Sequence, residues 1–399
     1  MTIILAHKIR LDPNNVQRTY FAKACGVARF AYNWALARWN QLFEAGEKVS
    51  EAALRKQLNA IKRTEFPWMM EVTKCAPQLA IMNLGRAFRN FFAGRAERPV
   101  FKRKGVHDSF ALSNDQFTIT DGHISIPNLG LVRLAEKLRF DGKILGAVIS
   151  RRADRWFVSI QVEMPRPTPI HTPKETPASE SQAVGVDLGV KELATLSDGT
   201  KIVGAKPHKA LLSRLRRLGQ SLSRKQGAKK GERKSKNFMK ARLKISKLHA
   251  RIADIRGDET HKLTTMLTQT YEIIGIEDLN VAGMVKNHKL ARSIMDMSFF
   301  EFRRQLEYKA DITGSRVVVA ERFFPSSKLC STNGCGYKHD ELRLDMREWI
   351  CPQCKVAHDR DVNAAVNLRN NAVSYTVSAC GELVETITSV KQELSIETA

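Results

Sequence analysis

Residues 184–189 have the sequence VGVDLG, a short apolar run that contains a single acid, Asp187. A run of this length and composition predicts a buried strand. A carboxylate in or at the end of a buried strand is costly unless it is paired or binds a metal ion. Asp187 is therefore the first candidate for a functional carboxylate.

Two further acids stand in similar contexts. Glu277 follows the stretch 271–276, YEIIGI, which ends in four apolar residues, and Asp361 opens a segment, 361–368, that predicts an amphipathic helix. If Asp187 and Glu277 lie on two strands of one sheet and Asp361 begins a helix against it, the three carboxylates can converge on one cleft. Carboxylate oxygens suit Mg²⁺ or Mn²⁺, and two such ions about 4 Å apart can activate water and stabilise the leaving oxygen of a phosphodiester. The trio therefore predicts a divalent-metal site.

Two neighbouring acids compete with these candidates. Asp278, next to Glu277, is expected to cap the segment that follows it rather than to bind metal. Asp359 rivals Asp361, but only Asp361 immediately begins the amphipathic helical pattern. For each acid taken alone a structural role would be the better explanation, so the prediction depends on the three together in a basic chain.

Four of the seven cysteines gather in one short segment. They form two pairs, Cys330 with Cys335 and Cys351 with Cys354, separated by a segment that predicts a hairpin. Four thiolates at this spacing favour one structural Zn²⁺ in tetrahedral geometry rather than disulfides. His339 and His358 could substitute as ligands, but we expect both to face solvent or phosphate.

The composition predicts a polyanionic partner. The 399 residues include 65 Lys and Arg against 41 Asp and Glu, a formal net charge of +24, which exceeds what solubility requires. The sequence has no run of about 18 apolar residues, and its N-terminal apolar stretch is too short for a signal peptide, so nucleic acid is favoured over a membrane. We expect a protein of the bacterial or archaeal cytoplasm.

Two basic segments are candidates for contact with a nucleic-acid backbone. One lies within residues 98–105, and the other within a predicted pair of helices whose residues 214–247 include a single acid, Glu232. Because solvated helix faces usually mix charges of both signs, a face of one sign favours phosphate binding. The candidate contacts are Lys102, Arg103, Lys104, Arg224, Lys225, Lys229, Lys230, Arg233, Lys234 and Lys236.

The first half of the chain combines a helical region with short strands. Apolar residues at helical spacing mark residues 15–95, whereas alternation between turn signals predicts strands within 117–160. A small β-barrel interrupted by a helical insertion would explain this order. Tyr20 and Trp34 of the first helix are expected in the core. Residues 164–182 are rich in Pro, Thr, Ser and Glu, which predicts a linker.

These motifs resemble those of the transposon-encoded TnpB family, compact relatives of type V CRISPR effectors. The resemblance rests on residues 185–189, 275–279, 324–330, 347–354 and 358–365, and in the first half on 109–110, 126–130 and 139–144. The order and spacing of these motifs make the match specific, and it covers most of the chain. One departure is the four residues between Cys330 and Cys335, where family members usually have two.

The resemblance implies a multidomain α/β architecture. Its parts would be a wedge-like β-barrel (1–14 and 96–165), a helical recognition insertion (15–95), a linker (166–182), an RNase H-like RuvC domain (183–324 and 358–378), an inserted zinc finger (325–357) and a flexible tail (379–399). It also implies an RNA-guided DNA endonuclease with Asp187, Glu277 and Asp361 as catalytic triad. The partners would be a guide RNA and double-stranded DNA with a short adjacent motif, bound by a monomeric ribonucleoprotein that selects sequence by guide pairing.

Three other functions remain open on the sequence. A DNA transposase could use the same three acids for strand transfer, because RNase H folds support both reactions. A guide-dependent repressor that no longer cuts is expected to have replaced these acids, and all three are present. A CRISPR effector would be distinguished by a repeat array in the neighbouring DNA instead of a transposon end.

Overall fold

The computed structural model describes residues 2–171, 182–225, 234–343 and 345–376. The chain divides into two compact units, Met1–Arg166 and Pro167–Ala399. The expected linker spans this boundary, but its residues 172–181 lie outside the described part, as does the expected tail 379–399. No helix in the described part is long and apolar enough to cross a membrane.

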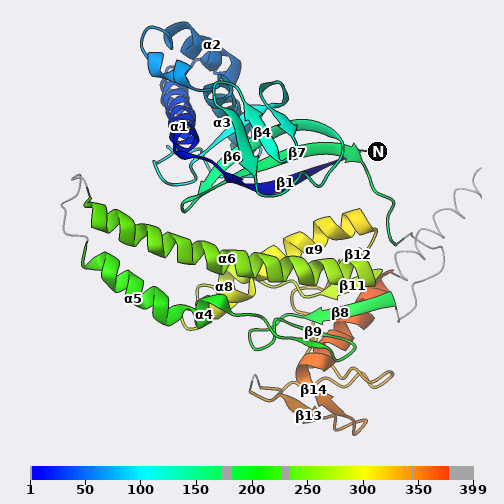
Figure 1. Cartoon of the computed structure of the whole chain (residues 1–399). Coiled ribbons are helices and arrows are strands. Elements are labelled where there is room, and N and C mark those ends of the chain that lie inside the picture. The colour runs from blue at the N-terminus through cyan, green and yellow to red at the C-terminus, as the bar shows by residue number, and fades with distance from the viewer. Residues whose placement is uncertain (1, 172–181, 226–233, 344, 377–399) are drawn as a thin grey trace, which may run out of the picture. The chain divides into compact units, whose positions relative to one another are not determined.

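The first unit is built around one antiparallel sheet of seven strands (Figure 1). The strands are β1 (Thr2–Asp12), β2 (Ser109–Ser113), β3 (Thr118–Thr120), β4 (His123–Ile126), β5 (Gly130–Leu134), β6 (Lys143–Arg152) and β7 (Arg155–Pro165), in the order β2-β6-β7-β1-β5-β4-β3. β1 pairs with β7 from Thr2 opposite Pro165 to Leu11 opposite Trp156. The predicted strands are present, and closure of the sheet into a barrel stays a prediction.

The helical insertion lies between β1 and β2. Its elements are α1 (Asn15–Glu44), α2 (Glu51–Ile61), the short 3-10 helix η1 (Pro67–Glu71) and α3 (Cys75–Phe92). α1 begins at a capping box, in which the Asn14 side chain accepts a hydrogen bond from the Gln17 backbone and the Gln17 side chain accepts one from the Asn14 backbone. The prediction of helices within 15–95 is confirmed.

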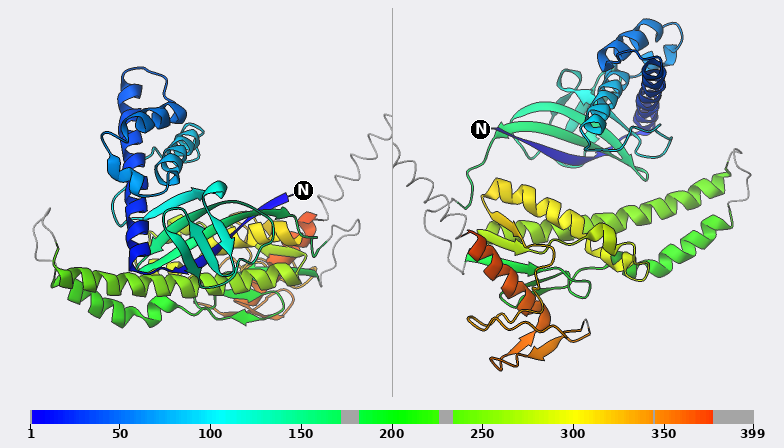
Figure 2. Two further views of the ribbon diagram at one scale, coloured as in Figure 1. Left: turned by 45° about the horizontal axis from the view of Figure 1, so that its top comes forward. Right: turned by 180° about the vertical axis from the view of Figure 1, so that it is seen from behind.

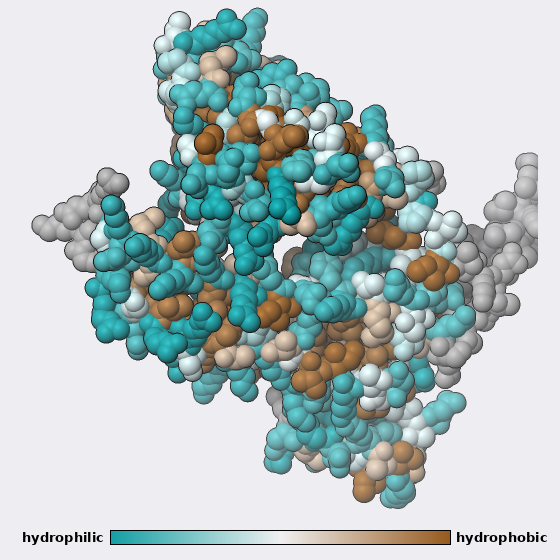
Figure 3. Space-filling view, viewed as in Figure 1, coloured by the Kyte–Doolittle hydropathy of each residue, from teal (hydrophilic) through white to brown (hydrophobic). Residues whose placement is uncertain are grey.

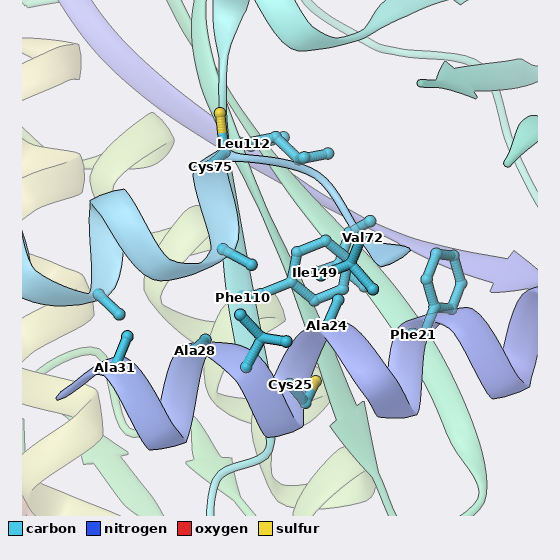
Figure 4. Packing of buried hydrophobic residues seen from close by; sticks show 14 of the residues in the cluster. Phe21, Ala24, Cys25, Ala28, Ala31, Val72, Cys75, Phe110, Leu112 and Ile149 are labelled. Atoms are coloured by element: carbon cyan, nitrogen blue, oxygen red, sulfur yellow. The ribbon is translucent and has the colours of Figure 1, made fainter. Parts of the chain in front are cut away.

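The core of this unit lies between α1, α3 and the sheet. Figure 4 shows Phe21 and Ala28 of α1 beside Phe110 of β2 and Ile149 of β6, and all four are buried. Tyr20 is buried in the same cluster, as expected, and Trp34 is partly buried against it. These aromatic residues therefore contribute to packing rather than to a surface that stacks on bases.

The second unit contains a five-stranded sheet in the order β10-β9-β8-β11-β12. The strands are β8 (Ala183–Asp187), β9 (Ala194–Leu196), β10 (Lys201–Ile202), β11 (Ile273–Ile276) and β12 (Arg316–Val319). β8, β11 and β12 are parallel, whereas β9 and β10 pair antiparallel. Parallel strands are covered on both faces, which explains why β8 and β11 appear in the sequence as continuous apolar runs.

The helices of this unit are α4 (Pro207–Ala210), α5 (Leu212–Ser223), α6 (Lys236–Thr270), α7 (Val281–Met284), α8 (Ala291–Met297), α9 (Phe299–Thr313) and a last helix described over 360–376. Some of them cover the two faces of the sheet. α5 and α6 lie side by side as the predicted pair (Figures 1 and 2). Leu263 of α6 and Phe302 of α9 pack in one cluster with Val186 and Ile276 of the sheet. The last helix packs on the opposite face, where Ala372 meets residues such as Ile273.

Glycines in two strands permit the close approach of the last helix. A Cβ atom at Gly185 would lie 1.8 Å from the carbonyl oxygen of Ala365, and one at Gly275 would lie 2.3 Å from that of Leu368. A side chain at either position would therefore push the helix off the sheet. These two glycines fix the position of the helix whose first turn contains Asp361.

A small finger precedes the last helix. Its hairpin consists of β13 (Glu348–Ile350) and β14 (Ala357–Asp359), with Trp349 opposite His358. An isolated bridge between Leu329 and Lys338 forms the other side of the finger. In Figure 1 the hairpin lies at the N-terminal end of the last helix, because β14 leads directly into that helix.

Candidate active site and zinc-binding cluster

Two of the predicted carboxylates lie at the same edge of the second sheet. Asp187 is the last residue of β8, and Glu277 directly follows β11. These strands are parallel neighbours with Val186 opposite Ile276, so the two acids leave the sheet side by side. The carboxyl-terminal edge of parallel strands is where open α/β sheets gather functional side chains.

The third carboxylate, Asp361, lies in the first turn of the last helix. The Asp359 carboxylate caps this helix by accepting hydrogen bonds from the backbone N–H groups of Asp361 and Val362, each at 3.0 Å. Asp359 also pairs with Lys201 at 2.6 Å. Asp359 is thus held by structural contacts, which supports Asp361 as the functional acid of the two.

The charges of the other two carboxylates act on Asp187. Burial, together with the negative charges of Glu277 and Asp361, raises the pKa of Asp187 to about 8, and Arg360 and Arg347 act in the opposite direction. Like charges that repel one another in a partly buried site are stabilised by a bound cation. Their oxygen atoms are the ligands that Mg²⁺ and Mn²⁺ prefer, so the donor set fits a divalent ion.

Glu277 and Asp361 have polar partners from the finger and the segment before it. The Ser326 hydroxyl donates a hydrogen bond to the Glu277 carboxylate. The Arg347 guanidinium lies 3.4 Å from both carboxylate oxygens of Asp361. Both partners restrict the orientations that the two carboxylates can adopt.

The four predicted zinc ligands come together in the finger. The sulfur atoms of Cys330, Cys335, Cys351 and Cys354 all lie within 4.8 Å of one another. The wider spacing of the first pair still allows the cluster to close, and the arrangement fits one tetrahedral Zn²⁺. Within the described ranges no other group of potential ligands is so compact, and this includes the three carboxylates.

The chain is similar to several known proteins. Family models match residues 159–288 ("Probable transposase"), 299–368 ("Cas12f1-like, TNB domain") and 1–48 ("Helix-turn-helix domain"). Two relatives carry the name "Putative RNA-guided DNA endonuclease". The protein of Streptomyces pristinaespiralis is 38% identical over 384 residues, which cover 94% of this chain and 91% of the relative. InsQ of Escherichia coli K12 is 33% identical over 411 residues, which cover 98% of each. The chain belongs to the TnpB family.

The fold of this TnpB-family chain is similar to that of a solved structure. In the cryo-EM structure of the Cas12f1-sgRNA-target DNA complex, a chain that is 14% identical superimposes with a TM-score of 0.52 over 88% of this chain and 83% of that one. At this identity the likeness concerns the fold, a mixed α/β architecture. Residues 1–48, which match the helix-turn-helix model, form strand β1 followed by the single long helix α1.

One expectation for the TnpB-family site is wrong. Asp278 does not cap the next helix, because the side chain of Asn280 is the cap of α7. Asp278 instead accepts hydrogen bonds from Arg303 and Arg322, each at 2.7 Å. Asp278 therefore has a structural role, but as the acceptor of hydrogen bonds from two arginines and not as a helix cap.

The expectation for His358 is also wrong. His358 is buried rather than facing solvent, with its ring centroid 4.8 Å from that of Trp349. Its Nε2 atom lies 3.1 Å from the sulfur of Cys330. The pairing of β13 with β14 places it there, and that register could not be deduced from the cysteine spacing.

Three polar residues near the TnpB-family site were missed by the sequence analysis. Ser326, Asn363 and Asn367 are 4%, 2% and 4% exposed. Asn363 and Asn367 are four residues apart on the last helix, so both point to the same side of it. Two amides four residues apart, on a helix face predicted to be apolar, were the feature of the sequence that could have indicated this polar cluster.

Seven of the ten basic residues predicted to contact nucleic acid lie in the described part of the chain. Lys229, Lys230 and Arg233 lie outside the described residues, whereas Lys102, Arg103, Lys104, Arg224, Lys225, Lys234 and Lys236 lie within them. The Lys102 ammonium lies 4.1 Å from the ring centroid of Tyr32, and Lys225, which follows the end of α5, donates to Ser221 of that helix. Hydrophilic side chains cover much of the α5 and α6 surface in Figure 3. Contact with nucleic acid stays a prediction.

We expect one zinc ion per chain by elemental analysis of the purified protein. Cys351→Ser should lower the zinc content by more than half and destabilise the finger, because a structural zinc ion contributes directly to folding. Cys75→Ser is the matched control, since Cys75 is a buried cysteine of the first unit. Equal zinc content in the two variants would contradict the ligand assignment.

Proposed function

We propose that this chain is an RNA-guided DNA endonuclease that hydrolyses phosphodiesters at Asp187, Glu277 and Asp361. The observation that carries the proposal is the position of Asp187 at the end of β8 beside Glu277, the residue after the parallel strand β11. Burial, together with the charges of Glu277 and of Asp361 in the last helix, raises the pKa of Asp187. The names of the relatives support the same activity. The five-stranded second sheet with its helices would form the RNase H-like RuvC domain that the family resemblance implies.

The three carboxylates would hold two Mg²⁺ ions, with Mn²⁺ as the nearest substitute. When bound, such ions supply a water nucleophile at neutral pH and offset the charge of the leaving oxygen. The chain itself would hold the three carboxylates in a fixed orientation. Asp187 is fixed by β8, Glu277 by the Ser326 hydroxyl and Asp361 by the capped first turn of its helix.

A cavity of about 420 Å³ beside Glu277 would admit the strand that is cut. Its walls include Phe300, which is 71% exposed, and the guanidinium groups of Arg303 and Arg322. An aromatic ring can stack on a base, and guanidinium groups can contact phosphates, as in other sites for single strands. The cavity therefore offers both kinds of contact next to a metal ligand.

The partners we propose are a guide RNA from the transposon end and double-stranded DNA that carries a short adjacent motif. Guide pairing would select the sequence, while the protein contacts backbone and motif. The net charge of +24 supplies the electrostatic attraction. The first unit would form the wedge-like barrel and helical recognition insertion of a monomeric ribonucleoprotein that acts in the cytoplasm and holds one structural Zn²⁺ in its finger.

Neutralising basic residues at the C-terminal end of α5 and the N-terminal end of α6 should weaken RNA binding in a salt-dependent way. Arg224→Gln, Lys225→Gln and Lys236→Gln are combined in one variant. We expect the negative slope of the logarithm of the binding constant against the logarithm of the salt concentration to become shallower by roughly 2 to 3, since each phosphate contact contributes about 0.7 to 0.9. Filter binding of the guide RNA between low and high salt measures this slope. A control variant at two exposed acids of α6, Asp254→Asn and Asp258→Asn, should not make the slope shallower. An unchanged slope would remove these three residues from the RNA interface.

Sequencing of the RNA that purifies with the protein, when it is expressed with its flanking DNA, tests the proposal. We expect a discrete RNA that runs into the border of the element. Protein that carries only random cellular RNA, and binds double-stranded transposon ends tightly without RNA, would support a transposase instead.

A further inference from the structure

The segment from Ser326 to Ser331 links the carboxylate site to the zinc cluster. Its first residue is 4% exposed and donates its hydroxyl hydrogen to the Glu277 carboxylate. Its fifth residue is Cys330, whose sulfur belongs to the zinc cluster. A displacement of this short segment would therefore disturb both sites.

Two amides of the last helix hold this segment in place. Asn367 donates hydrogen bonds to the carbonyl oxygens of Ser326 at 2.8 Å and Leu329 at 2.6 Å. Asn363 donates to Leu329 at 2.7 Å, and its own carbonyl oxygen accepts from the Ser331 backbone at 2.9 Å. Both amides are almost completely buried, where an unsatisfied partner would be costly. The same helix contains Asp361, so it connects the carboxylate site, the segment from Ser326 to Ser331 and the zinc cluster.

We propose that Ser326 is a positioning residue for Glu277, and that Asn363 and Asn367 form a clamp that holds Ser326 and the zinc cluster in register with the carboxylate site. The inference rests on the proposed function, in which Glu277 is a metal ligand. A hydrogen bond donated to a ligating carboxylate fixes its orientation, and loss of such a partner typically lowers metal affinity about 10-fold to 100-fold. Zinc binding in the finger thereby supports the geometry of the carboxylate site without contact with the substrate.

Binding of Mn²⁺ to the full-length ribonucleoprotein, measured by electron paramagnetic resonance of the free ion, tests the role of Ser326. Ser326→Ala should bind Mn²⁺ at least about 10-fold more weakly, with zinc content and guide RNA binding unchanged. Ser326→Thr retains the hydroxyl group and should restore the affinity. Ser327→Ala is the matched control, because the carbonyl oxygen that Asn363 contacts there is retained.

The clamp is tested by Asn367→Leu and Asn363→Leu, with Asn370→Leu as control because Asn370 accepts from Arg369 instead of holding the segment. Both clamp variants should weaken Mn²⁺ binding as Ser326→Ala does. Asn363→Leu should also speed the loss of zinc to a chelator, since the bond next to Cys330 is lost. If Asn363→Leu does not fold, Asn367→Leu tests the clamp alone through the shared contact at Leu329.

The outcomes separate this inference from the proposed function. Wild-type Mn²⁺ affinity in Ser326→Ala overturns the positioning role, provided that Glu277→Ala has lost the binding. Wild-type affinity in Asn367→Leu overturns the clamp. If Glu277→Ala binds Mn²⁺ as tightly as the wild type, the metal site itself is wrong and the proposed function fails with it.

Discussion

Asp187→Ala should lower the rate of DNA cleavage by roughly 10³-fold or more while RNA and DNA binding stay intact. Burial and the charges of Glu277 and Asp361 act directly on the Asp187 carboxylate and raise its pKa. Its removal would delete a proposed metal ligand and leave the basic surfaces unchanged. Single-turnover cleavage of guide-matched DNA in Mg²⁺ measures the rate, and a gel shift in Ca²⁺ measures binding.

Asp278→Asn is the matched control for this variant. Asp278 follows Glu277 in sequence but is held by Arg303 and Arg322 in partly exposed ion pairs. Such exposed pairs contribute little, so we expect a loss of less than about 10-fold. A wild-type cleavage rate in Asp187→Ala, or an equal loss in both variants, would refute the site assignment.

Gly185→Ala should destabilise the second unit by at least about 3 kcal/mol, because overpacking against a backbone atom cannot be relieved by a change of rotamer. The added methyl group would lie 1.8 Å from the carbonyl oxygen of Ala365. The last helix would have to move away from β8, and Asp361 would move with it. Chemical denaturation followed by circular dichroism measures the free energy of unfolding, and cleavage should be lost in parallel.

Gly257→Ala is the control for the glycine substitution. Gly257 lies within α6, and an added Cβ atom there meets no neighbour within 4 Å. Alanine favours a helix over glycine by about 1 kcal/mol, so this variant should be slightly more stable than the wild type. If Gly185→Ala were as stable as Gly257→Ala, the close packing of the last helix on the sheet would be wrong.

Much of this arrangement could be predicted from the sequence because burial leaves a local pattern. The apolar run 184–189 predicted a buried strand that contains Asp187, and β8 ends at this residue. The apolar run before Glu277 predicted β11. The spacing of the four cysteines predicted a cluster that the structure contains, even with the wider first pair.

The remaining features depend on tertiary contacts that leave a weaker trace in the sequence. The role of Gly185 becomes visible only when Ala365, 180 positions further along, lies against it. The environment of His358 follows from its pairing opposite Trp349. Ser326 was included in a family motif, but its contact with Glu277 depends on a segment that two asparagines of the last helix hold in place.

Cleavage of matched and scrambled DNA by the purified ribonucleoprotein tests the central claim most directly. Two duplexes would carry the same adjacent motif, one matching the RNA that purifies with the protein and one with that sequence scrambled. We predict that the matched duplex alone is cut, that EDTA stops the reaction and that Mg²⁺ restores it. A matched duplex that remains intact in Mg²⁺, or equal cutting of both duplexes, would contradict an RNA-guided, metal-dependent endonuclease.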